Sequence, residues 1–264
     1  MRKENKQFKE FSGQEMTSAL WKFALANQHQ ARLGKYLGGI IHNLNGALQN
    51  TQIQFELLQL VLQAGESSLE SPAVKGRLRQ LGEELDRLAE MLNFWGEQAD
   101  FEGLADMQRV DLRQAIDDAL TFMQANPRFK HQISVHLDLP QLPHIMANRL
   151  LVVHTLTALL EAVLARLPQQ GGCCLPLRAA VGEDSVQIIV ECNGDDSPES
   201  WPSSGYQGGD AAGEQNHMGQ IPGHHLDLNL HLADRAIAPF GGSIRCRTVG
   251  GKTRYTVCFA IPSQ

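Results

Sequence analysis

The stretch LGKYLGGIIHNLNGALQNTQIQFELLQLVL, residues 33–62, decides the fold of this 264-residue chain. Its apolar residues recur mostly in alternating steps of four and three, which is the period of an α-helix with one apolar seam. The seam comprises Leu33, Leu37, Ile40, Leu44, Ala47, Thr51, Phe55, Leu58 and Leu62. The stretch therefore predicts a long helix, close to coiled-coil spacing, with a face that needs a partner.

A second helix with a cleaner seam follows a short polar turn. The turn is marked by Gly65, Ser67, Ser68, Ser71 and Pro72, and the seam beyond it comprises Leu78, Leu81, Leu85, Leu88, Leu92 and Trp95. Two such helices joined by a short loop predict an antiparallel hairpin, which we assign to residues 29–103. One hairpin leaves its apolar seam half covered, so we expect two hairpins to form a four-helix bundle in a homodimer.

The segments on either side of the hairpin differ in character. Residues 1–28 are polar and predict a short helix around Met16, Leu20 and Phe23. Residues 104–264 predict helices at 110–123, 150–167 and 224–238, strands at 133–137, 186–190, 244–249 and 255–261, and a mobile loop at 193–223. The fold class is therefore α+β: a dimeric helical hairpin followed by an α/β sandwich, with helices on one face of a mixed sheet.

The composition excludes several classes of protein. A formal net charge of −6 argues against nucleic-acid binding, which usually needs a basic face. Five cysteines without a CxxC pair indicate reduced cytosolic thiols and no metal site. The longest apolar stretch, 150–167, is interrupted by His154, Glu161 and Arg166 and is too short and too polar to cross a bilayer. We expect a cytoplasmic protein without membrane insertion.

The run Gly39-Ile40-Ile41-His42-Asn43-Leu44-Asn45-Gly46-Ala47-Leu48 resembles the phosphoacceptor motif of two-component histidine kinases. The downstream order is similar to that family as well, with Asp138-Leu139-Pro140 at a strand end, an apolar helix ending in Glu161-Ala162, and Gly241-Gly242 before the last hairpin. The resemblance covers residues 30–262. It implies a dimerisation and histidine phosphotransfer hairpin in front of an ATPase-like domain of the GHKL type.

The resemblance makes His42 the phosphoacceptor. His42 lies two positions beyond Ile40, about 200° round a helix, so it points away from the seam. Asn43 and Asn45 are the candidate residues beside it in the reaction. The polar, small-residue side on which a partner would approach comprises Lys35, Gly38, Asn45, Gly46 and Gln49.

Two positions beside His42 depart from the family pattern. Asn43 stands where the family has an acidic residue that helps to deprotonate the histidine, and an amide cannot act as a base at neutral pH. Gly46 stands where many members have a threonine or asparagine used in dephosphorylating the partner. Both departures argue against intrinsic kinase and phosphatase chemistry.

The nucleotide-binding positions of the family are also replaced. Aligning on Glu161 places His154 and Ala158 where the family has two asparagines, and Ala158 has no atom that could bind the Mg²⁺ held there. Cys192 replaces the adenine-reading aspartate two residues before Gly194. We therefore expect a degenerate nucleotide site, little or no ATP binding, no required cofactor, and Mg²⁺ on the partner.

Three functions are compatible with these residues. The first is a phosphorelay protein in which His42 accepts and passes a phosphoryl group between aspartates of response-regulator receiver domains. The second is a divergent but active sensor kinase that autophosphorylates His42. The third is a non-catalytic pseudokinase that binds a receiver domain or a kinase. The expected partners are a second copy of the chain, receiver domains and an upstream histidine kinase.

Overall fold

The computed structural model describes residues 13–63, 71–99, 107–168, 171–193, 225–249 and 252–262. The chain divides into two compact units. A hairpin unit comprises Gln30–Gly103 together with Thr121–His131. A sandwich unit comprises Met1–His29, Leu104–Leu120 and Gln132–Gln264. Among the described residues, no helix has both the length and the apolar composition needed to cross a membrane.

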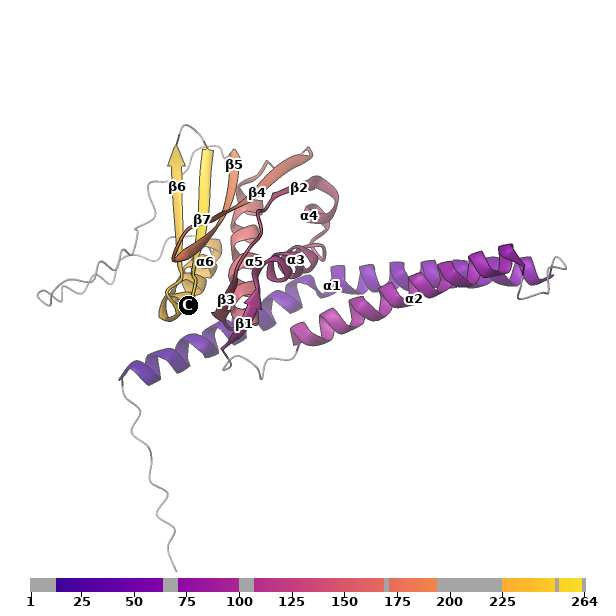
Figure 1. Cartoon of the computed structure of the whole chain (residues 1–264), viewed down its shortest axis with the longest axis horizontal. Coiled ribbons are helices and arrows are strands. Elements are labelled where there is room, and N and C mark those ends of the chain that lie inside the picture. Colours follow the sequence, from indigo (N-terminus) through magenta and orange to yellow (C-terminus); the bar gives the residue numbers. More distant parts are fainter. Residues whose placement is uncertain are drawn as a thin grey trace, which may run out of the picture. The chain divides into compact units, whose positions relative to one another are not determined.

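The hairpin is formed by α1 (Gly13–Gln63) and α2 (Pro72–Ala99), which run antiparallel in Figure 1. Both helices of the predicted hairpin are therefore present. The short helix expected in the N-terminal segment is not separate, because α1 continues without a break from Gly13 to Gln63. The predicted turn lies largely outside the described residues, and Pro72 is the first residue of α2, where its missing N–H costs nothing.

The core of the hairpin unit is aromatic. It is closed by α3 (Leu112–Met123), whose last turn belongs to this unit, and by the short helix α4 (Pro127–Gln132). The ring of Phe122 lies 5.8 Å from that of Tyr36 on α1 and 5.4 Å from that of Trp95 on α2. The rest of the cluster comprises Ile40, Ala125, Leu33, Leu44 and Phe94. Residues 121–131 are thus packed on the hairpin itself.

The sandwich unit is built on a mixed five-stranded sheet. Its order is β2 (Ile133–Asp138), β4 (Cys173–Val181), β5 (Ser185–Asn193), β7 (Lys252–Ala260) and β6 (Ser243–Val249). The pair β2–β4 is parallel and the other pairs are antiparallel. A separate two-stranded sheet pairs β1 (Gln108–Asp111) with β3 (His144–Ala147).

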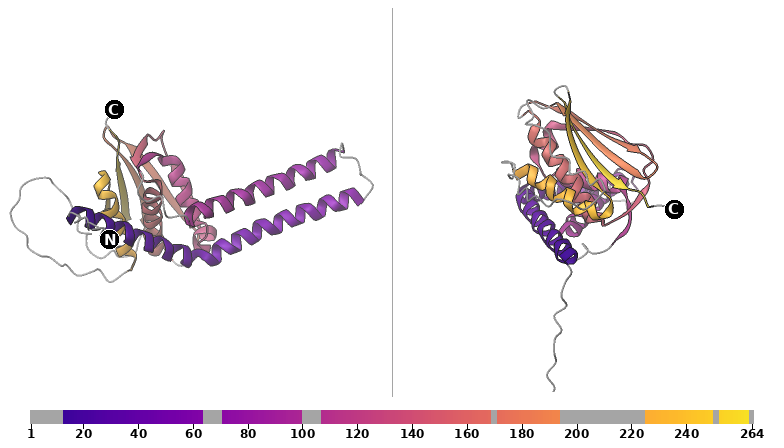
Figure 2. Two further views of the ribbon diagram at one scale, coloured as in Figure 1. Left: turned by 90° about the horizontal axis from the view of Figure 1, so that it is seen from below. Right: turned by 90° about the vertical axis from the view of Figure 1, so that its left-hand side faces the viewer.

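The helices α5 (Arg149–Arg166) and α6 (His225–Ile237) cover one face of the five-stranded sheet (Figure 2). Alternate residues of β5 and β7 are buried on that face, including Ile188 and Val257, while Gln187 and Arg254 are exposed on the other. Every residue of α5 from Leu151 to Leu164 is buried. The predicted fold class, a helical hairpin followed by an α/β sandwich with helices on one face, is confirmed.

Several elements differ from the sequence-based prediction. The helix predicted at 110–123 begins only at Leu112, because Val110 and Asp111 belong to β1. The strands β1, β3 and β4 and the helix α4 were not predicted. The predicted loop 193–223 lies outside the described residues except for Asn193, which ends β5.

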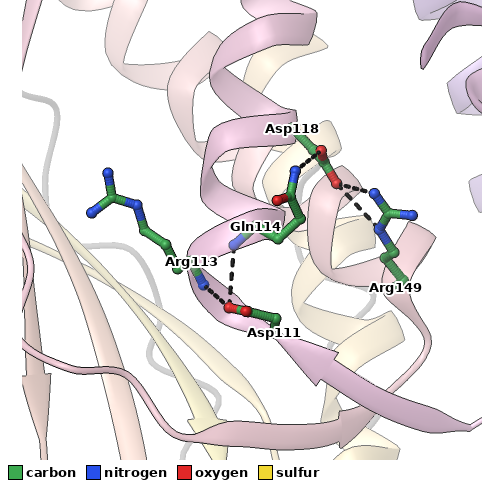
Figure 3. A network of polar contacts seen from close by, with 5 residues as sticks. All are labelled: Asp111, Arg113, Gln114, Asp118 and Arg149. Atoms are coloured by element: carbon green, nitrogen blue, oxygen red, sulfur yellow. Dashed lines mark hydrogen bonds and ion pairs between the residues drawn. The ribbon is translucent and has the colours of Figure 1, made fainter. Parts of the chain in front are cut away.

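A polar network fixes the start of both α3 and α5 (Figure 3). Asp111 Oδ1 accepts hydrogen bonds from the N–H groups of Arg113 (2.8 Å) and Gln114 (3.3 Å), which caps α3. Asp118 is buried, and its two oxygens accept from Gln114 Nε2 (3.0 Å) and from the guanidinium of Arg149 (2.7 and 3.2 Å). Because both oxygens are satisfied, this buried carboxylate holds α3 to the first residue of α5.

Candidate functional site

His42 lies near the middle of α1 with an exposed side chain. Among the residues of the predicted partner side, Lys35, Gly38, Asn45 and Gln49 are exposed and Gly46 is half-buried. The ammonium group of Lys35 lies 4.9 Å from the centre of the Tyr36 ring, two helical turns before His42. The imidazole of His42 is thus open to a macromolecule that approaches the flank of the hairpin.

Asn43 is turned away from this open side and contacts residues 121–131. Its Nδ2 donates to the carbonyl oxygen of Gln124 at 3.1 Å. Its Oδ1 accepts from the ammonium group of Lys130 at 2.5 Å. Both ends of the Asn43 amide therefore bind groups of the segment that closes the aromatic core. The sequence motif did not reveal this segment, because Lys130 lies 87 residues away along the chain.

Gly39 permits the close approach between α1 and this segment. A Cβ atom on Gly39 would lie 1.7 Å from the carbonyl oxygen of Ala125 and 2.8 Å from its carbonyl carbon. No side chain fits such a space, so glycine is required here for packing. In contrast, a Cβ atom on Gly34, Gly38 or Gly46 would meet nothing within 4 Å. Gly39 and Asn43, one helical turn apart, together dock residues 121–131 beside His42.

The residues of the expected degenerate nucleotide site lie mainly on α5. His154, Ala158 and Glu161 are only 3%, 1% and 3% exposed. Their spacing of four and three places them on one face of the helix. The ring of His29, on α1 in the same unit, lies 4.0 Å from that of His154 in an edge-on arrangement. The chain's own helix therefore lies against the position where the family has its first asparagine.

The side chains of His154, Ala158 and Glu161 do not fit a magnesium–nucleotide complex. Mg²⁺ prefers oxygen ligands, and Glu161 is the only one of the three α5 residues that has a side-chain oxygen. The part of the chain that the structure describes contains no group of three or more His, Cys, Asp or Glu residues able to hold a metal ion. A nucleotide would also have to reach side chains that are buried.

Cys192, the position aligned with the adenine-reading aspartate, is buried at the end of β5. Burial raises the pKa of its thiol, Arg166 opposes this change, and Cys246 adds to it. A neutral thiol accepts hydrogen bonds only weakly and cannot replace a carboxylate. Gly194 lies outside the described residues.

Comparisons with known proteins return histidine kinases among solved structures. No family model matches the sequence, and no curated protein matches it. The histidine kinase AdeS of Acinetobacter baumannii is 15% identical and matches over 80% of this chain and 97% of that chain, with a TM-score of 0.42. A histidine kinase of Burkholderia phymatum is 12% identical over 82% and 98%, with a TM-score of 0.44. The catalytic domain of the histidine kinase ThkA is 13% identical over 59% and 95%, with a TM-score of 0.45.

Proposed function

We propose that this protein is a cytoplasmic histidine phosphotransfer protein of two-component signalling, with little or no ATP-dependent kinase activity. One contrast between the two units carries the proposal. The candidate phosphoacceptor His42 is exposed on the flank of the hairpin, whereas His154, Ala158 and Glu161 are buried in the sandwich. A chain with this arrangement can receive a phosphoryl group from another protein far more readily than it can generate one from ATP.

In the proposed reaction a receiver domain with a phosphoaspartate docks beside His42. A ring nitrogen of His42 attacks the phosphorus in line, the bond from phosphorus to the aspartate oxygen breaks, and the imidazole proton is released to solvent. The reverse step passes the group to a second receiver. Mg²⁺ held by the receiver neutralises the phosphoryl oxygens, so this chain contributes position and orientation. Asn45, Gly46 and Lys35 line the approach.

We further propose that the hairpin works as a homodimer, because it exposes two long apolar rows. The row on α1 comprises Leu37, Ile41, Leu48, Phe55 and Leu62, and the row on α2 comprises Leu78, Leu85 and Leu92. The spacing in both rows is mainly seven residues, which keeps apolar residues on one face when helices supercoil. The exposed fractions of the α2 leucines are 42%, 49% and 54%, so one copy of the chain leaves them half uncovered.

The α2 row gives a direct test of the homodimer. Leu85→Gln removes an apolar contact twice in a symmetric dimer, so the dissociation constant should rise by about a hundredfold or more. Sedimentation equilibrium across a concentration series measures this change. Glu83→Gln is the matched control, because Glu83 lies about 200° round the helix from Leu85 and its ion pair with Arg79 is exposed. Equal dissociation constants for the two variants would place the dimer interface elsewhere.

The phosphotransfer proposal is tested by comparing phosphoryl donors. With a phosphorylated receiver as donor and no ATP, label should appear on His42 and be lost again when a second, unphosphorylated receiver is added. With Mg-ATP as the only donor, no label should appear, and titration calorimetry should detect no binding of Mg-ATP. Micromolar affinity for Mg-ATP together with ATP-driven labelling of His42 would instead identify an active kinase. Tight receiver binding without any label would identify a non-catalytic binding protein.

A further inference from the structure

Lys130 places a positive charge beside the phosphoacceptor turn of α1. It lies in α4, whose start is capped by Asn126, because Asn126 Oδ1 accepts from the N–H groups of Arg128 (2.9 Å) and Phe129 (3.3 Å). The N–H group of Lys130 also donates to the carbonyl oxygen of Asn126 at 2.9 Å. The backbone of Lys130 is therefore fixed, while its side chain is exposed.

The ammonium group of Lys130 is bound by Asn43, the residue that follows His42. Because Asn43 Nδ2 donates to the Gln124 carbonyl, the amide has a single orientation in which Oδ1 faces Lys130. The close approach at Gly39 sets the depth at which this segment rests on α1. The side chain of Asn43 thus orients the ammonium group of Lys130.

We propose that Lys130 binds the phosphoryl group of phospho-His42, with Asn43 as the positioning residue that keeps the ammonium group nearby. The proposal rests on His42 being the phosphoacceptor. Phosphorylation adds about −1.5 to −2 charges to His42, which directly precedes Asn43. An ammonium group is attracted to a charged phosphoryl oxygen by a Coulomb interaction that a neutral amide oxygen does not offer. Lys130 therefore exchanges the Asn43 amide oxygen for a phosphoryl oxygen when His42 is phosphorylated.

This contact should prolong the lifetime of phospho-His42. In hydrolysis, water attacks phosphorus, the bond from phosphorus to the ring nitrogen breaks, and the leaving imidazole keeps one proton of the water. The ammonium group stabilises the phosphorylated side chain before water attacks, so hydrolysis starts from a lower free energy and meets a higher barrier. Loss of the Lys130 charge should accordingly accelerate hydrolysis. For an exposed charge pair the expected change is about two- to fivefold.

The test uses chemical phosphorylation of the full chain, so that no receiver is needed. Phosphoramidate donates its phosphoryl group to a histidine nitrogen and releases ammonia, and tandem mass spectrometry follows the label on His42 with time. Lys130→Met, which keeps the side-chain length without the charge, should shorten the half-life of phospho-His42 about two- to fivefold, and Lys130→Arg should restore it. Lys75→Met is the matched control, because Lys75 is also an exposed lysine but lies in the first turn of α2.

A variant of the positioning residue separates this role from a purely structural one. Asn43→Asp keeps an acceptor for Lys130, adds a charge that competes with the phosphoryl group and removes the donor to the Gln124 carbonyl, so the half-life should fall. Thermal unfolding of the same variant shows whether the chain stays folded. Equal half-lives in the wild-type chain and Lys130→Met, or no label on His42 in the wild-type chain, would overturn the assignment of Lys130. A Lys130-dependent half-life without exchange to any receiver would refute the relay alone.

Discussion

A His42→Gln chain is expected to take up no label from a phosphorylated receiver, with transfer at least about a hundredfold below that of the wild-type chain. Glutamine has no ring nitrogen, and its amide nitrogen is not nucleophilic at neutral pH, so it cannot attack the phosphorus. His42 is exposed, so the free energy of unfolding should change by no more than about 0.5 kcal/mol. Acid-labile label on the intact chain, followed over time, measures the result.

The control for this experiment is His136→Gln. His136 is also an exposed histidine, and it lies on β2 of the sandwich unit. Its substitution should leave transfer unchanged. Equal label on the wild-type and His42→Gln chains would remove His42 from the reaction and with it the proposed relay.

The second large effect is expected from Gly39→Ala, which should lower the free energy of unfolding of the hairpin unit by about 1–3 kcal/mol. The added Cβ atom would lie 1.7 Å from the Ala125 carbonyl oxygen, and both groups belong to backbones that cannot simply rotate away. Residues 121–131 must shift, which weakens the contacts of Phe122 and of Asn43 described above. Urea unfolding, followed by the fluorescence of Trp95 in a chain that also carries Trp21→Phe and Trp201→Phe, measures the loss.

Gly34→Ala provides the opposite expectation with the same chemical change. A Cβ atom at Gly34 meets nothing within 4 Å, and alanine is the better helix former. This variant should gain about 0.5–1 kcal/mol of stability. If Gly39→Ala were as stable as Gly34→Ala, the close contact between α1 and Ala125 would not exist in solution.

The apolar period was sufficient to predict both hairpin helices, because each seam extends over several turns. The two-stranded sheet was missed for a physical reason. Its strands β1 and β3 have four residues each, which is too short for an alternating pattern to stand out. Strand β4 was missed because Pro176 argues against a strand interior. Its antiparallel pairing with β5 begins only at Leu177, whereas Pro176 is paired with His136 in the parallel ladder with β2.

The site was predictable only where it depends on local spacing. The exposure of His42 follows from its angle to the seam, which the sequence contains. The contact between Asn43 and Lys130 joins residues 87 apart, and no local pattern reports it. One local signal was overlooked: Asn126 followed by Pro127 is typical of a capped helix start and could have predicted α4.

The burial of α5 from Leu151 to Leu164 has a consequence for the engineering of this domain. Ala158→Asn, which would introduce a side-chain oxygen, would place an amide where the side chain is 1% exposed, and an unsatisfied buried amide costs about 1–3 kcal/mol. His154 already contacts His29, so an asparagine at position 154 would leave a gap. Neither substitution brings this face closer to nucleotide binding without first destabilising the fold.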